Sequence, residues 1–226
     1  TSSGTLINIK SFKKLGARNL NSHKGTHGKL LCVGGNEGTA GAIRLTSEAA
    51  LRAGAGMVKV YTHSSSVVPV SIGRPELMVS SGNLQQALEW ASSVVIGPGL
   101  GQNKWAQHTF IEVIYYCQTN SIPLVIDADA LNLLAKQTSS YTLKQCVLTP
   151  HPGEASRLLS VTTQEIESNR FENARLCAKR YNATCVLKGA GTLIDNAENT
   201  WVCKDGNPAL AVGGSGDVLT GIIGAL

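Results

Sequence analysis

The sequence predicts an α/β fold in which helices cover both faces of a mostly parallel sheet. Several short runs are apolar at every position rather than at alternate positions, which is typical of strands buried on both sides. Segments with helical spacing of apolar residues separate these runs, as expected where a crossover helix follows each strand. The 226 residues, of which 42% are hydrophobic, suffice for one such domain and exclude a wholly disordered chain.

The expected elements follow one another from about residue 25. Strands are predicted at Lys29–Val33, 57–62, Ser93–Ile96, Leu124–Ile126, 146–149 and Thr184–Leu187. Helices are predicted at about Ala40–Ala53, at 104–117, at 131–135, and from a capping box at 162–165 to about residue 181. Thr192–Asp195 and Thr200–Cys203 predict a hairpin that turns at 196–198, and a final helix follows the glycines at 213–216.

The ends and the charge of the chain limit its partners. Residues 1–24 lack an apolar period, so we expect an arm or linker ahead of a domain at 25–226. The net charge of +5 comes from scattered basic residues without interleaved aromatics, which argues against nucleic-acid binding. No uncharged run reaches the ~18 apolar residues of a membrane span, and no signal segment opens the chain, so we expect no membrane association.

The six cysteines are expected to be reduced. Cys32, Cys146 and Cys185 lie within apolar runs, where a thiol behaves as a small core residue. The sequence contains no C-x-x-C pair for zinc or redox chemistry. This use of cysteine favours a cytoplasmic location.

Unusual residues follow five of the predicted strands. They are glycines at 34–35 and 97–101, acidic residues at 127–129, a proline-flanked histidine at 149–152, and a lysine–glycine pair at 188–189. Since ligands of parallel α/β sheets bind beyond the carboxyl ends of the strands, this accumulation predicts an enzyme or a tight ligand binder.

The most informative segment is Gly213, Gly214, Ser215 and Gly216 followed by Asp217. Glycines let backbone N–H groups turn toward an anion, and the start of the following helix adds its positive end, so these four residues form a candidate phosphate or oxyanion loop. A carboxylate at Asp217 beside that loop would serve as a general base that takes a proton from an attacking hydroxyl. The alternative is an ordinary helix-start aspartate.

Other candidate residues have two interpretations each. Asp127 and Asp129 would bind a metal or polar substrate groups, or cap the helix that follows, which is favoured for Asp129. His151 is open to a functional or a structural role, and Glu154 to metal ligation or a place at a helix start. Lys188, ahead of Gly189 and Gly191, suits nucleotide phosphates but also an ordinary turn.

Several familiar sites are absent from the sequence. Residues 34–38 do not complete the dinucleotide pattern G-x-G-x-x-G, although this loop and the small residues at 39–42 either admit a ligand or pack a helix closely. There is no G-x-S-x-G or Walker A motif. The remaining histidines lack metal-ligand spacing, so no metal ligand is assigned.

Taken together, the motifs resemble those of the NAD(P)H-hydrate dehydratase family within the ribokinase-like superfamily. They are 21–28 (NSHKGTHG), 49–56 (AALRAGAG), 74–78 (RPELM), 97–101 (GPGLG), 127–132 (DADALN), 149–154 (TPHPGE) and 213–217 (GGSGD). The resemblance implies a ribokinase-like three-layer sandwich and a lyase for metabolite repair. Such an enzyme dehydrates the S epimer of hydrated NADH and NADPH (NADHX and NADPHX) with ADP or ATP as phosphoryl donor.

The same resemblance implies roles for individual residues. Contacts to NAD(P)HX are expected from Ala42, Gly101, His151 and the catalytic Asp217. Contacts to the nucleotide are expected from Lys188, Gly189, Ala190, Gly191, Thr192 and Gly216. It also implies Mg²⁺ on the phosphates, a homotetramer, and in many bacterial relatives an upstream epimerase domain to which residues 1–24 would be the linker. The family normally continues well beyond the position of Leu226, so the domain is expected to be truncated at its carboxyl end.

Two alternatives remain beside the dehydratase. The first is a ribokinase-like kinase for a vitamin precursor such as hydroxymethylpyrimidine or hydroxyethylthiazole, against which the His151 loop and the segment 74–78 argue. The second is a sensor that binds a nucleotide without turnover. Such a protein would have no need of a base at Asp217 beside the phosphates.

Overall fold

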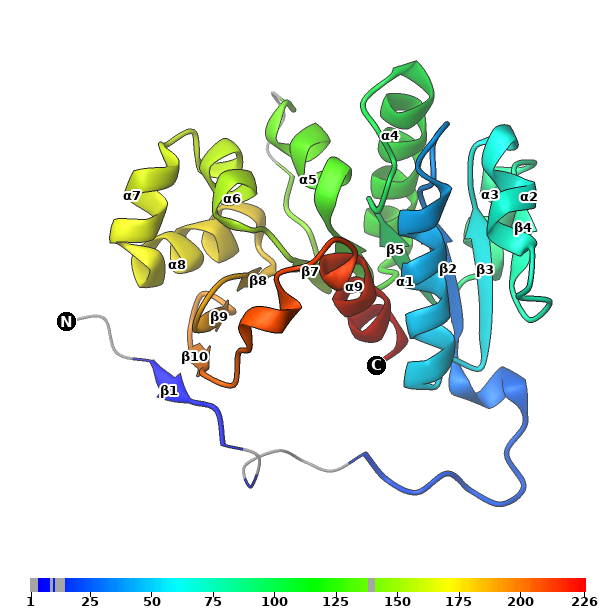
Figure 1. The fold of residues 1–226 in the computed structure, drawn as a ribbon, viewed down its shortest axis with the longest axis horizontal. Coiled ribbons are helices and arrows are strands. Elements are labelled where there is room, and N and C mark those ends of the chain that lie inside the picture. The colour runs from blue at the N-terminus through cyan, green and yellow to red at the C-terminus, as the bar shows by residue number, and fades with distance from the viewer. Residues whose placement is uncertain (1–3, 9, 11–14, 138–140) are drawn as a thin grey trace.

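A ten-stranded sheet organises the part of the chain that the structure describes (Figure 1). The structure is a computed structural model, and it describes residues 4–8, 10, 15–137 and 141–226. The strand order is β1-β10-β9-β8-β7-β6-β5-β2-β3-β4. The strands are β1 (Thr5–Leu6), β2 (Lys29–Val33), β3 (Met57–Tyr61), β4 (Met78–Ser80), β5 (Ser93–Ile96), β6 (Leu124–Ile126), β7 (Cys146–Leu148), β8 (Thr184–Leu187), β9 (Thr192–Asp195) and β10 (Thr200–Cys203).

The sheet is parallel from β4 to β8, and β9 runs antiparallel to both of its neighbours. The predicted hairpin is therefore confirmed as β9–β10. The strand β1 lies within the predicted arm and pairs in parallel with β10, so the arm contributes to the edge of the sheet. A strand of two residues is too short to show a periodic pattern, which is why this strand was not predicted from the sequence.

Helices cover both faces, which confirms the predicted α/β class. They are α1 (Ala40–Ala53), α2 (Val67–Ser71), α3 (Leu84–Trp90), α4 (Lys104–Asn120), α5 (Ala128–Ala135), α6 (Pro152–Leu159), α7 (Thr163–Ser168), α8 (Arg170–Tyr181) and α9 (Ser215–Ala225). In β2, Leu31 and Val33 pack with the side chains of α3 to α8, and Leu30 and Cys32 pack with those of α1, α2 and α9. Burial on both faces explains the unbroken apolar strands.

The structure differs from the predicted elements in two respects. The single helix expected from 162 to 181 is two helices, because Asn169 leaves the helical conformation at φ −132° and ψ 48°. The helices α2, α3 and α6 and the strand β4 were not among the predicted elements, although a helix start was one of the two interpretations of Glu154. All six cysteines are free and five are buried, as their apolar surroundings indicated. Burial raises the pKa of the Cys32 thiol to about 12, so this thiol stays protonated.

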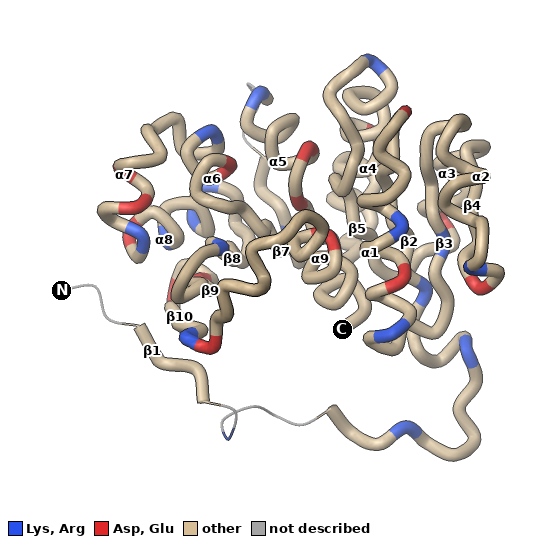
Figure 2. Tube along the Cα trace, in the orientation of Figure 1, with Lys and Arg blue, Asp and Glu red and all other residues tan. Residues whose placement is uncertain are grey.

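Charged residues are distributed over most elements rather than gathered on one face (Figure 2). Within the described ranges no helix is long and apolar enough to cross a membrane.

Helix α9 lies against α1 at a contact that only glycine allows. A Cβ atom on Gly221 would stand 2.0 Å from the carbonyl oxygen of Thr46 in α1. The missing side chain therefore sets how closely the two helices approach, and with it the position of the glycine loop at the start of α9.

We predict that Gly221→Ala destabilises the protein by ~1–3 kcal/mol, because the added methyl group separates α9 from α1. Gly41→Ala is the matched control, since Gly41 also lies in a helix but a Cβ there meets nothing within 4 Å. Alanine has the higher helix propensity, so the control should be neutral or slightly stabilising. Urea unfolding of both variants measures the difference, and equal effects would contradict the close-contact explanation.

Candidate active site

The carboxyl ends of β2, β5, β6, β7 and β8 meet at one edge of the sheet, where the loops that follow them are tied together. The N–H of Gly35 donates to the carbonyl of Pro98 over 3.0 Å, and the N–H of Lys188 donates to that of Pro150 over 2.8 Å. The unusual residues that follow these strands are thus brought to one place, as the sequence predicted.

The glycine loop leads directly into the first turn of α9. Gly214 is the N-cap residue, with φ 90° in the left-handed region, and no side chain caps the helix. A Cβ on Gly214 would also lie 2.6 Å from the Leu45 side chain, so glycine is required here for two reasons. The N–H of Ser215 donates to the carbonyl of Val212 over 3.4 Å. The N–H groups of Gly216 and Asp217 have no carbonyl partner within the helix, so they and the positive end of α9 are available to an anion.

Asp217 stands in that first turn, partly buried. The pKa of its carboxyl group is raised to about 6, mainly by burial and then by the negative charges of Asp127 and Asp129, while the Lys188 ammonium acts in the opposite direction. A carboxylate with a pKa in this range is a stronger base than an ordinary aspartate and is still ionised at neutral pH. The geometry thus fits the general base that the spacing predicted.

The Asp127 side chain occupies the centre of the site. One carboxylate oxygen lies 2.9 Å from the Lys188 Nζ, and the other accepts a hydrogen bond of 2.7 Å from the hydroxyl of Thr220 in α9. A Cβ on Gly216 would lie 3.5 Å from the Lys188 Nζ, so the ammonium faces the glycine loop. The sequence left Asp127 open to metal ligation, to contact with polar substrate groups and to helix capping. The structure does not support the last of these, because α5 begins without a side-chain cap from Asp127.

The backbone around Asp127 is constrained. Ala128 has φ 48°, a left-handed conformation that costs about 1–2 kcal/mol for a residue other than glycine. On the neighbouring strand end, a Cβ on Gly97 would stand 1.8 Å from the carbonyl oxygen of Asp127. Strain of this kind persists where the surrounding structure fixes a conformation, and it is most common at functional sites.

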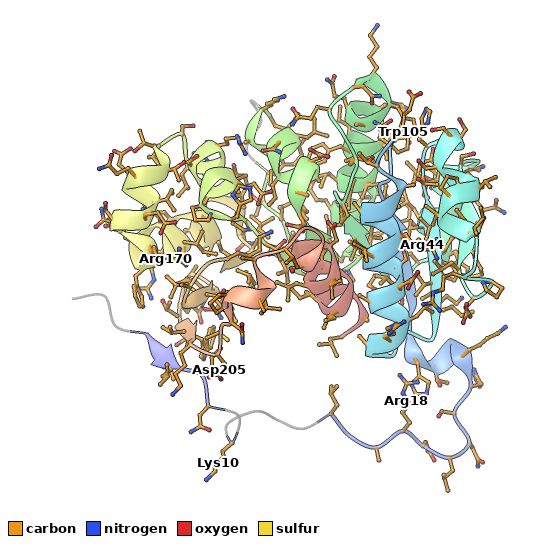
Figure 3. All side chains as sticks on the ribbon, in the orientation of Figure 1. Lys10, Arg18, Arg44, Trp105, Arg170 and Asp205 are labelled. Carbon is orange, nitrogen blue, oxygen red and sulfur yellow. The ribbon has the colours of Figure 1, made fainter. Side chains whose placement is uncertain are left out.

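The loop from Lys188 to Thr192 connects β8 to β9, and Arg170 holds it in shape (Figure 3). The Arg170 guanidinium donates to the carbonyls of Leu187, Lys188 and Gly191 over 3.3–3.4 Å. A Cβ on Gly189 would lie 2.9 Å from it. Ala190 is exposed, and the Thr192 hydroxyl donates to the carbonyl of Gly189 over 3.0 Å. No pattern in the sequence distinguished Arg170, which lies at the start of α8 among polar and charged residues.

His151 has a structural role in this arrangement. It is the N-cap of α6: its Nδ1 accepts from the N–H of Gly153 over 3.0 Å, and its own N–H donates to Glu154 over 2.8 Å. This reciprocal pair is a capping box, so Glu154 takes the helix-start role that was one of its two interpretations. The His151 side chain is 51% exposed, and its Nε2 lies 3.5 Å from Glu154, whose other oxygen is 3.8 Å from the Lys188 Nζ.

Gly101 and Ala42 border the other side of the sheet edge. The N–H of Gly101 donates to the Asp129 carboxylate over 2.8 Å, so Asp129 helps to fix the loop after β5. A Cβ on Gly101 would lie 2.8 Å from the amide nitrogen of Asn36. Asn36 is buried and donates to the carbonyl of Leu100, so it joins the loops after β2 and β5. Its only signal in the sequence was its position after Gly35. Ala42 lies half-buried in the first turn of α1.

Among the residues that the structure describes, no group of three or more His, Cys, Asp or Glu side chains is arranged to hold a metal ion.

Comparison with known proteins identifies the family. The sequence profile of NAD(P)H-hydrate dehydratases matches residues 30–226. The Escherichia coli bifunctional NAD(P)H-hydrate repair enzyme is 50% identical over 209 residues, which cover 91% of this chain and 39% of that protein. The ADP-dependent (S)-NAD(P)H-hydrate dehydratase of Neisseria meningitidis is 38% identical, covering 93% of this chain and 72% of that protein. The chain thus spans about two fifths of the length of the bifunctional relative.

Solved structures agree with the sequence comparison. The Bacillus subtilis ADP/ATP-dependent NAD(P)H-hydrate dehydratase, co-crystallised with ATP and Mg²⁺, superposes with a TM-score of 0.81 at 32% identity, covering 93% of this chain and 76% of that one. The three-layer sandwich is accordingly the ribokinase-like fold that the motifs implied. With a profile match over most of its length, the chain belongs to the NAD(P)H-hydrate dehydratase family.

Proposed function

We propose that the protein dehydrates the S epimer of NADHX and NADPHX to NADH and NADPH at the expense of ADP or ATP. One observation carries the proposal. Asp217, a carboxylate whose pKa is raised to about 6, directly follows the glycine loop that opens α9 without a side-chain cap, and it lies close to the Lys188 ammonium. A base, an anion-binding loop and a cation beside one another are the parts that phosphoryl transfer to a hydroxyl group requires. The names of the Neisseria and Bacillus relatives support the same reaction.

The reaction follows from these parts. Asp217 takes the proton of the hydroxyl on the hydrated nicotinamide ring, and the oxygen attacks the terminal phosphoryl group of the nucleotide. N–H groups of the loop formed by Gly213, Gly214, Ser215 and Gly216 and the positive end of α9 stabilise the charge that develops on the phosphoryl oxygens. Lys188 neutralises the leaving nucleotide. The phosphorylated ring then loses phosphate, pushed out by the lone pair of the ring nitrogen, and loss of a ring proton restores the double bond.

The substrate ring is proposed to lie between the loops that carry Gly101 and His151. Gly101 and Ala42 have little or no side chain, which leaves room for a ring and its ribose. The exposed edge of His151 faces the same sheet edge, and its capping bonds fix the orientation of the imidazole. The nucleotide is proposed to lie along Lys188, Gly189, Ala190, Gly191 and Thr192, with its phosphates at Gly216.

The residues present fit a Mg²⁺ ion that is held mainly by the nucleotide. The Asp127 oxygens are engaged by Lys188 and Thr220, and Glu154 caps α6, so the ion would be carried by nucleotide phosphates docked at Gly216 and Lys188, and by water. Bound there, it would neutralise phosphate charge.

We also propose the wider setting that the family resemblance implies. This is a homotetramer in a reducing cytoplasm, with an epimerase domain upstream of a linker formed by residues 1–24. The E. coli relative is named a bifunctional repair enzyme, which supports a second domain.

The first experiment follows absorbance at 340 nm with fresh NADHX and the full-length protein, with ADP, with ATP and with neither. We expect absorbance to grow only when a nucleotide is present, and the faster nucleotide names the donor. A flat trace with NADHX, together with a stable phosphorylated product when hydroxymethylpyrimidine or hydroxyethylthiazole replaces NADHX, would instead establish the kinase. Binding of nucleotide without any turnover would establish the sensor.

Asp217→Asn should lower kcat by ~10²–10⁴, because the amide cannot accept the hydroxyl proton. Nucleotide affinity, measured by titration calorimetry, should change little, since the loop and Lys188 are intact. Asp205→Asn, on an exposed turn, is the matched control and should behave like the wild type. Undiminished turnover in Asp217→Asn would remove Asp217 from the role of base.

The raised pKa of Asp217 also predicts how activity and stability depend on pH. Activity should fall as pH drops below about 6, because the base becomes protonated. The stability of the fold should change with pH in the opposite direction to activity. A carboxyl group whose pKa is raised in the folded state favours folding when it is protonated, and this contribution is lost as the pH rises from near 3.8 through about 6. Thermal melting of Asp217→Asn should therefore exceed that of the wild type at pH 8, and the difference should vanish near pH 4. No difference at pH 8 would refute the perturbed pKa.

A further inference from the structure

Asp127 joins two parts of the proposed phosphoryl-transfer site that are far apart in the sequence. It follows β6, and it is 1% exposed. Its two carboxylate oxygens bind partners on opposite sides: Lys188, at the end of β8, and Thr220, in the second turn of α9. Thr220 is fully buried, so neither nucleotide nor substrate reaches its side chain.

These contacts fix what the nucleotide would meet. The Lys188 ammonium carries three donors on a flexible stem, and nothing in its own strand determines where it points. Asp127 holds it against Gly216, where a Cβ would lie 3.5 Å from the Nζ and 3.9 Å from the nearer Asp127 oxygen. Thr220 follows Asp217 by three residues, so a bond at Thr220 holds the turn from which Asp217 projects.

We propose that Asp127 is a positioning residue that, through Thr220 and Lys188, sets the amino-terminal turns of α9 and the ammonium relative to each other for phosphoryl transfer. This inference rests on the proposed function for its reaction but not for its geometry. Two independent observations show that the position of Asp127 is itself fixed: the left-handed backbone of Ala128 and the contact of Gly97 with the Asp127 carbonyl. Asp127 therefore acts as a rigid reference point between two strands and a helix.

The decisive variant is Thr220→Val, which keeps the shape of the side chain and removes only the donor to Asp127. Misplacement of a reacting group by about 1 Å costs up to ~10²-fold in rate, so we expect kcat to fall by ~10- to 100-fold with a smaller change in nucleotide KM. Thr220→Ser restores the hydroxyl and should recover most of kcat. Thr46→Val is the matched control, and its kcat should remain near wild type. It removes a buried hydroxyl at the same α1–α9 contact, and among the described residues that hydroxyl donates only to the carbonyl of Ala42 in its own helix.

Asp127→Asn adds a measurement, the pH dependence of the rate, that a loss of stability alone would not change. The charged groups that bear on Asp217 are Asp127 and Asp129 near the start of α5 and Lys188 at the end of β8, where Glu154 of α6 faces the ammonium. Removing the Asp127 charge leaves Lys188 less compensated, so the acid limb of the rate profile should move to lower pH. An unmoved limb would overturn the link between Asp127 and Asp217.

Hydrogen exchange of the backbone amides of residues 213–218 in the ligand-free, full-length protein tests whether the Asp127–Thr220 bond holds the start of α9, independently of the reaction. Thr220→Val should exchange faster there and Thr46→Val should not. Wild-type kcat in Thr220→Val, or a loss in Thr220→Ser equal to that in Thr220→Val, would overturn the proposal. If the wild-type protein fails to dehydrate NADHX with every nucleotide, the proposed function falls. The exchange data then test the positioning role of Asp127 separately. Faster exchange in Thr220→Val but not in Thr46→Val supports that role, and equal exchange in the two variants overturns it.

Discussion

The geometry of the site depends on the charge of Asp127 being compensated where almost no water reaches it. An isolated carboxylate in such a place would cost several kcal/mol, and Lys188 and Thr220 together supply what water would otherwise provide. A buried ion pair often stabilises a fold little more than apolar side chains of the same volume, but loss of one partner leaves the other uncompensated. The ends of β6 and β8 and the start of α9 are therefore coupled: a change in any of the three leaves a buried polar group without its partner.

The other constraints at the sheet edge act in the same direction. Gly97 lets β5 approach the Asp127 backbone, and Gly214 lets α9 begin beside Leu45. Arg170 donates to three carbonyls of the segment 187–191 and so holds the connection between β8 and β9. Each device fixes backbone rather than contributing a reacting group. A phosphoryl-transfer site needs this, because its catalysis is largely positioning and charge stabilisation.

The sequence predicted the parts of this molecule that local patterns specify. The central strands were found because burial on both faces makes every position apolar, and Asp217 was found because glycines directly precede it. The break at Asn169 was missed because neither glycine nor proline interrupts the segment from 162 to 181. His151 was not predicted as a helix cap because the usual caps are Ser, Thr, Asp and Asn. The Asp127–Thr220 bond spans 93 residues and carries no local signal, so only the fold reveals it.

The pairing of Lys188 with Asp127 also resolves a conflict between nucleotide binding and the strength of the base. A cation beside the phosphates favours binding of the nucleotide, yet the same cation lowers the pKa of a nearby carboxyl group and makes it a weaker base. Lys188 stands close enough to oppose the raised pKa of Asp217, but it is paired with Asp127, whose own charge acts in the opposite sense. The ammonium thus keeps donors for the phosphates while its effect on the base is offset. A lysine held by a neutral partner would leave Asp217 a weaker base, which is why the partner at this position has to carry a negative charge.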